Sequence, residues 1–105
     1  MTRKIALIKT TVNSEEEAKE IIDALMKSEL AASIQYFPIS SVYRWKGQIE
    51  KSEEFVLFIK STHSKFKAIE QKIKEIHVYE VPEIVMIPIE KASEEYHKWI
   101  VDQVK

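Results

Sequence analysis

The sequence predicts an α+β fold in which strands and helices follow one another as βαββαβ, with one extra helix at the C-terminal end. Three observations predict it. The 105 residues fit a single domain, 1–105. Apolar residues recur with strand spacing and helix spacing in turn, with no linker or repeat between the segments. The single glycine, Gly47, lies between two long strand-like runs, which predicts a hairpin.

The first strand and the first helix are predicted by an apolar run and a capping pattern. Residues 5–8 are apolar on both faces of a predicted strand over 3–12, as in the centre of a sheet. Ser14 and Glu17 have the spacing of a capping box, so a helix is expected to begin there and to run to about Lys27. Its apolar stripe consists of Ala18, Ile21, Ile22, Leu25 and Met26.

The predicted hairpin is long for the body of the domain. Its strands cover residues 30–46 and 48–60, and about 17 residues at ~3.3 Å each would span roughly 55 Å. A compact domain of this length has a radius of gyration of about 13 Å, so the hairpin is expected to project or to bend. Pro38 predicts a bend or bulge, because proline cannot donate to the ladder. Trp45 near the tip favours assembly through exposed hairpins. In the alternative, Pro38 folds the hairpin back and Trp45 covers its own core.

The second half of the chain predicts a helix, a loop, a strand and a last helix. Ser64 is expected to cap the first of these helices, and residues 77–83 form the loop. The fourth strand covers 84–89, with Pro88 at an edge or outside the ladder. Ser93 is expected to cap the last helix. The apolar stripes of the two helices are Phe66, Ile69, Ile73 and Ile76, and then Tyr96, Trp99, Ile100 and Val104. This order is that of a ferredoxin-like sandwich, an antiparallel sheet with two helices on one face, extended by a C-terminal helix.

Composition excludes several classes of function. The formal net charge of −1 leaves no basic excess to neutralise phosphates, so nucleic acid is not an expected partner. The absence of cysteine excludes disulfides, thiolate catalysis, zinc fingers and iron–sulfur clusters. Apolar runs are far shorter than the ~20 residues of a membrane span, and the first residues do not read as a signal peptide. A cytoplasmic protein without a membrane partner is therefore expected.

The side chains give little support for catalysis, and the protein is not expected to be an enzyme. One glycine cannot build a phosphate-cradling loop, and three scattered histidines show no Ser–His–Asp pattern. Glu53 and Glu54 are adjacent on a predicted strand, so they point to opposite faces and cannot share a proton. Both are expected on the surface, and the acidic run over 15–17 is expected to be a solvated helix face.

His77 is the best-placed candidate for a metal ligand. It leaves the second helix at its C-terminus and is followed by Tyr79, Glu80 and Glu83 in a loop. Imidazole and carboxylate together suit Cu(II) or Zn(II). In the alternative, His77 simply caps the helix. The same cluster is the only one that could be nominated for acid–base chemistry.

Four segments carry a resemblance to a known family. Residues 41–50, SVYRWKGQIE, resemble the hairpin motif of the CutA family, S-x-Y-x-W-x-G-x-[IL]-E. Residues 77–84, HVYEVPEI, resemble its H-P-Y-E-x-P-E-I loop. Residues 30–32, LAA, and 96–100, YHKWI, are similar to the start of its second strand and to its last helix. The likeness covers nearly the whole chain in order.

This resemblance implies a cytoplasmic homotrimer of ferredoxin-like subunits, similar in architecture to PII signalling proteins. It implies a role in divalent-cation tolerance and in the response to metal ions, with copper binding, no catalysed reaction and no organic cofactor. The metal ligand carried over is His77. The family's other pocket residues fall on Tyr43, Trp45, Glu50, Lys60, Tyr79 and Glu83.

The chain departs from the family pattern at three positions. Some relatives have cysteines where this chain has Thr10 and Ser33, so a tight Cu(I) site is not expected and a weaker Cu(II) or other divalent site remains. Val78 replaces the usual proline beside the histidine. The alternative function is a PII-like signalling scaffold that binds a small anionic ligand or a protein partner between subunits, for which Lys60 and Arg44 would matter most.

Overall fold

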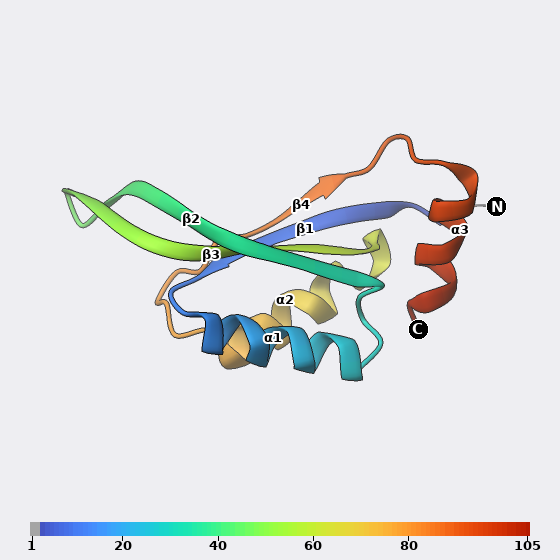
Figure 1. Cartoon of the computed structure of the whole chain (residues 1–105), viewed down its shortest axis with the longest axis horizontal. Helices are drawn as coiled ribbons and strands as arrows, with labels where there is room; N and C mark the ends of the chain where they lie inside the picture. The colour runs from blue at the N-terminus through green and yellow to red at the C-terminus, as the bar shows by residue number, and fades with distance from the viewer. Residues whose placement is uncertain (1–2) are drawn as a thin grey trace.

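The computed structural model describes residues 3–105 and confirms the predicted order of elements (Figure 1). The elements are β1 (Ile5–Val12), α1 (Glu15–Lys27), β2 (Ser33–Trp45), β3 (Gln48–Thr62), a 3₁₀ turn (His63–Lys65), α2 (Phe66–Ile76), β4 (Ile84–Pro88) and α3 (Glu94–Gln103). The strands form one antiparallel sheet in the order β2-β3-β1-β4. Helices α1 and α2 lie together on one face of this sheet, and α3 lies at one end.

The main core lies between the sheet and the two helices. The central strands contribute alternate residues to it, because directly paired residues share one face of the sheet. Fully buried side chains from four elements meet there: Ile8, Val12, Ala18, Ile21, Leu25, Leu57, Ile59, Ile69 and Ile73. The predicted stripes of α1 and α2 are therefore confirmed, except that Met26 lies 43% exposed at the edge of α1.

Two of the three predicted helix caps are confirmed. Ser14 Oγ accepts a hydrogen bond from the Glu17 N–H at 3.1 Å, and Ser93 caps α3 in the same way. The prediction for Ser64 is wrong. The chain makes a 3₁₀ turn before α2, so Lys65 is the N-cap residue, and the Ser64 hydroxyl lies 3.1 Å from the hydroxyl of Thr62 instead.

The hairpin projects beyond the helices, at the left of Figure 1. Its turn has positive φ angles of 50° at Lys46 and 81° at Gly47, as a type I′ turn requires. The predicted bulge at Pro38 is wrong, since pairing runs without a shift along the whole hairpin and Pro38 pairs with Phe55. The proline is tolerated because β2 is an edge strand, where a missing N–H can face away from β3.

The second face of the sheet is only partly covered. Helix α3 covers one end, where Ile100 and Val104 pack against Ile5 and Ala32 in a small second core. The rest of this face, which we call the open face, is opposite α1 and α2. Its large apolar side chains, Phe37, Val85 and Ile87, remain 42–47% exposed. Tyr96 and Trp99 of α3 are also exposed, at 38% and 40%.

One buried hydroxyl predicts a stabilising substitution. Thr10 is fully buried, and its Oγ1 has no hydrogen-bond partner among the described residues. An unsatisfied buried hydroxyl costs roughly 1–3 kcal/mol, so Thr10→Val, which keeps the shape, is expected to raise the free energy of unfolding by about 1 kcal/mol. Denaturant titration measures this value. Ser61→Ala is the matched control, because Ser61 Oγ donates to the carbonyl oxygen of Leu30 at 2.6 Å and its loss should destabilise. A destabilised Thr10→Val variant would contradict the prediction.

Candidate functional site

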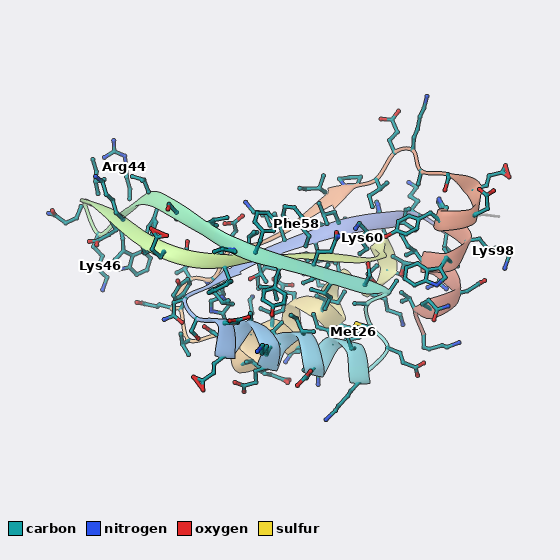
Figure 2. The ribbon with its side chains drawn as sticks, in the orientation of Figure 1. Met26, Arg44, Lys46, Phe58, Lys60 and Lys98 are labelled. Carbon is teal, nitrogen blue, oxygen red and sulfur yellow. The ribbon has the colours of Figure 1, made fainter. Side chains whose placement is uncertain are left out.

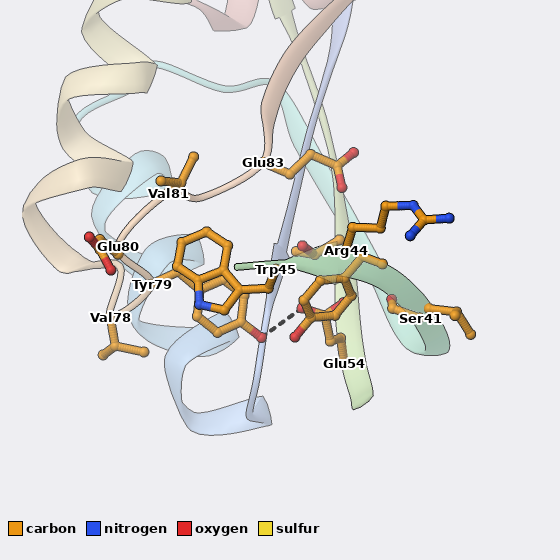
Figure 3. Close-up of a pocket in the computed structure, with 12 residues that line it drawn as sticks. Ser41, Arg44, Trp45, Glu54, Val78, Tyr79, Glu80, Val81 and Glu83 are labelled. Carbon is orange, nitrogen blue, oxygen red and sulfur yellow. Dashed lines mark hydrogen bonds between the residues drawn. The ribbon is translucent and has the colours of Figure 1, made fainter. Parts of the chain in front are cut away.

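A cleft of about 750 Å³ opens between the hairpin and the loop that follows α2 (Figure 3). Four of the residues predicted for the site line it, namely Tyr43, Trp45, Tyr79 and Glu83. The remaining lining residues are Thr11, Ser41, Val42, Arg44, Glu54, Val78, Glu80 and Val81. The structure thus brings together the two motif segments, residues 41–50 and 77–84.

Strand alternation places the hairpin side chains of the cleft. Tyr43 and Trp45 are two residues apart on β2, so they leave the same face of the strand. Glu54 on β3 pairs with Ile39, which has the same parity, so its carboxylate points to that face as well. Tyr79 completes the wall from the loop of residues 77–83.

Tyr79 and Glu54 form the closest polar contact in the cleft. The Tyr79 hydroxyl donates to Glu54 Oε2 at 2.6 Å, drawn as the dashed line in Figure 3. Burial and the neighbouring carboxylate raise the pKa of Tyr79 well above its usual value, so the phenol stays protonated and remains a donor at neutral pH. The expected surface position of Glu54 is wrong, because only 6% of the residue is exposed. Glu53 does point away, and it accepts from Ser40 Oγ at 2.9 Å.

His77 lies behind the cleft wall and has no open coordination position. Its side chain is fully buried, and Nε2 donates to the backbone oxygen of Thr11 at 2.6 Å. Nδ1 accepts from the Tyr79 N–H at 3.1 Å, which fixes the tautomer. The residue also ends α2, where its own N–H donates to Ile73 O at 2.8 Å, as the alternative interpretation expected. Both ring nitrogens therefore have protein partners in this structure, and the residue ties the loop to β1.

Glu17 is a second buried carboxylate that the sequence analysis placed in solvent. It is 6% exposed, and its Oε2 accepts from the Val78 N–H at 2.9 Å. The same oxygen lies 3.4 Å from His77 Nδ1, while Oε1 is buried without a hydrogen-bond partner in the described structure. The solvated-face prediction holds for Glu15 and Glu16, which are exposed. The only signal for Glu17 was its place in the capping box.

Besides His77, two predicted site residues lie outside the cleft. Lys60 Nζ donates to Gln35 Oε1 at 2.9 Å and lies 5.9 Å from the centre of the Tyr96 ring, toward the α3 end of the sheet (Figure 2). Glu50 is opposite Tyr43 on the hairpin but does not line the cleft. These two residues therefore do not join the aromatic and acidic side chains near the loop.

The charges around the cleft are mainly acidic. Glu54, Glu80 and Glu83 line it, and Glu83 forms an ion pair with Lys9 at 3.0 Å. Among the described residues that line the cleft, Arg44 is the one cation, and its guanidinium points away from Tyr79 and Glu54 in Figure 3.

Residues 3–105 contain neither a cluster of metal ligands nor a membrane-spanning helix. No three or more histidine, aspartate or glutamate side chains in this range are arranged to hold a metal ion. The helices in this range are all too short or too polar to span a membrane.

Comparisons with known proteins agree with one another. The family model for "CutA1 divalent ion tolerance protein" matches residues 6–103. The "Divalent-cation tolerance protein CutA" of Thermus thermophilus is 40% identical over 86% of this chain and 88% of its own length. A structure of the "Periplasmic divalent cation tolerance protein CutA" from Archaeoglobus fulgidus has a TM-score of 0.94 and 37% identity, covering 96% of this chain and 99% of its own. CutA1 from Oryza sativa has a TM-score of 0.95 and 30% identity, covering 99% and 96%.

Proposed function

The chain belongs to the CutA1 divalent ion tolerance family, and we propose on this basis that it is a homotrimeric binding protein in the response to copper or another divalent metal ion. We further propose that it is not an enzyme and that it works in the cytoplasm. The family membership supports the link to divalent cations. The location stays a prediction, because one similar structure carries the word periplasmic in its name.

The open face is the observation that carries the proposed assembly. Exposed aromatic and aliphatic side chains on one sheet face usually mark a surface that another chain covers. Strands β2 and β4 are both free edges, and a projecting hairpin can add to the edge of a neighbour. Identical contacts of this kind made head to tail close a ring, and three subunits are the number implied by the sequence resemblance.

Two sets of donors are available to a divalent metal ion in this proposal. His77 with the Glu17 carboxylate at 3.4 Å offers one nitrogen and one oxygen donor, a pair that suits Cu(II). An ion at Nδ1 would have to displace the Tyr79 N–H, so any binding there would be weak. Carboxylates that the assembled subunits bring together are the other donors available to a divalent ion.

Calorimetric titration with Cu(II) and Zn(II), with light scattering for the mass, tests this function. We expect the mass of three chains and saturable binding of a divalent ion. His77→Ala is compared with His63→Ala, which changes a histidine outside the cleft. Loss of metal binding in His77→Ala alone would support His77 as a metal ligand, and unchanged binding would reject this assignment. A trimer that binds neither ion would reject the metal role.

The alternative of a PII-like scaffold is favoured by the size of the cleft and not by its charge. A volume of about 750 Å³ is within the range of small-molecule sites. Lys60, which was expected to hold an anion, lies away from it. Charge reversal at Lys60 is therefore expected to leave ligand-induced stabilisation unchanged, as thermal-shift measurements with nucleotides and metabolites can check. A loss of stabilisation would instead support the binding of an anionic ligand near Lys60.

A further inference from the structure

We propose that the cleft binds a small organic cation, such as an alkylammonium group, between Tyr43, Trp45 and Tyr79 with Glu54 as its counter-ion. This inference goes beyond the proposed response to metal ions, because it concerns the cleft and names the class of ligand that the cleft takes. It is distinct from divalent-ion binding, which needs several hard or imidazole donors at one point.

The aromatic walls give the first argument. Rings from two separate elements line one cleft, Tyr43 and Trp45 from β2 and Tyr79 from the loop. Tyr43 is 42% exposed and Trp45 is 37% exposed in the single chain, and both line the cleft. The faces of such rings attract cations, and most strongly those with weakly held hydration shells, such as methylated ammonium groups.

The buried carboxylate gives the second argument. Glu54 is more than nine-tenths buried, yet it lines the cleft. One of its oxygens, Oε2, accepts from Tyr79. The other, Oε1, forms no hydrogen bond in the described structure and keeps some contact with solvent, so it is accessible from the cleft. A buried negative charge is costly unless it is paired. An ammonium group in the cleft would supply the missing charge partner at this oxygen.

The other charged residues around the cleft also favour a cationic ligand. Among the described residues, Lys9 pairs with Glu83, Arg44 turns its guanidinium outward, and Lys46 Nζ lies 5.6 Å from the centre of the Trp45 ring. None of these cations forms an ion pair with Glu54 or Glu80 in the described structure. An anionic ligand would be repelled by these carboxylates. A bare metal ion would find no cluster of three suitable ligands among residues 3–105. A cleft of about 750 Å³ with aromatic walls fits an organic body that carries a positive charge.

The test compares tetramethylammonium with tert-butanol, a neutral molecule of similar shape. The signal is the NMR chemical shift of the Trp45 indole N–H, assigned with the Trp45→Phe variant, at constant ionic strength. We expect saturable binding of tetramethylammonium and about tenfold weaker binding of tert-butanol. This ratio corresponds to about 1.4 kcal/mol, which lies between the values of cation–π attraction at exposed and at desolvated sites.

Two neighbouring glutamates provide matched variants. Glu54→Gln keeps an acceptor for Tyr79 and removes the charge, so it should weaken tetramethylammonium about tenfold and leave tert-butanol unchanged. Glu53→Gln, on the opposite face, should change neither. Equal binding of both probes, no saturation, or an equal effect of the two variants would overturn the proposal. Calorimetry with Cu(II) on the same samples judges the metal role separately, so either proposal can fail while the other stands.

Discussion

Replacement of Ile87 by lysine is expected to separate the proposed trimer into monomers. Ile87 is 47% exposed on the open face and pairs with Leu7 in the sheet. Burying an isoleucine between subunits would contribute about 1.5–3 kcal/mol per site. A lysine there would forfeit this term and would place an unpaired ammonium group in the interface, at a cost of several kcal/mol. The lost burial and the cost of the unpaired charge add up in each subunit, and we expect their sum to exceed the free energy of association.

Met26→Lys is the matched control for this prediction. Met26 is 43% exposed on α1, on the other side of the sheet, so the same new side chain enters a position of similar exposure. Light scattering across a concentration series should give the mass of one chain for Ile87→Lys and of three for Met26→Lys. The Ile87 variant should also unfold at a lower temperature, because subunit binding stabilises the folded chain. A trimeric Ile87→Lys protein would show that the open face is not the interface.

The fold could be predicted because local signals agreed with each other. The stripe of α2, the caps at Ser14 and Ser93 and the turn at Gly47 all depend on residues close in sequence. Pro38 was misjudged because its effect depends on where β2 lies in the sheet. An edge strand tolerates a proline that a central strand would not, and strand order is a long-range property.

The candidate site could be predicted only in part, because burial depends on how distant segments meet. Tyr43, Trp45, Tyr79 and Glu83 were found through motifs, and the structure groups them. Glu54 was missed because strand alternation gives its face but not the loop that covers it.

For His77, the sequence suggested a functional role that its surroundings in the structure do not favour. A histidine beside glutamates in a loop has the composition of a metal site. In the structure its two nitrogens are used by Thr11 and Tyr79, which no spacing rule shows. The buried pair of Glu17 and His77 therefore works, in the described structure, as the anchor of the loop that carries Tyr79.

Removal of the Glu17 carboxylate is expected to loosen this anchor and to destabilise the protein by about 2 kcal/mol. The substitution Glu17→Ala leaves the Val78 N–H without its acceptor, and hydrogen bonds to charged groups are worth roughly 1.5–3 kcal/mol. An opposing effect exists, since the buried Oε1 without a partner is itself costly in the native protein. We expect the lost bond to dominate, because the charge also helps to hold the loop over the end of β1.

The neighbouring glutamate supplies the control for this expectation. Glu16→Ala, one residue away on the exposed face of α1, should change the free energy of unfolding by less than about 0.5 kcal/mol. Native-state hydrogen exchange gives the local readout, since the amides of Val78 and Tyr79 should exchange faster in Glu17→Ala while those of the β1–β3 ladder follow only the global loss. If Glu17→Ala were more stable than the native protein, the cost of the unpaired Oε1 would outweigh the bond, and Glu17 would not be the anchor of the loop.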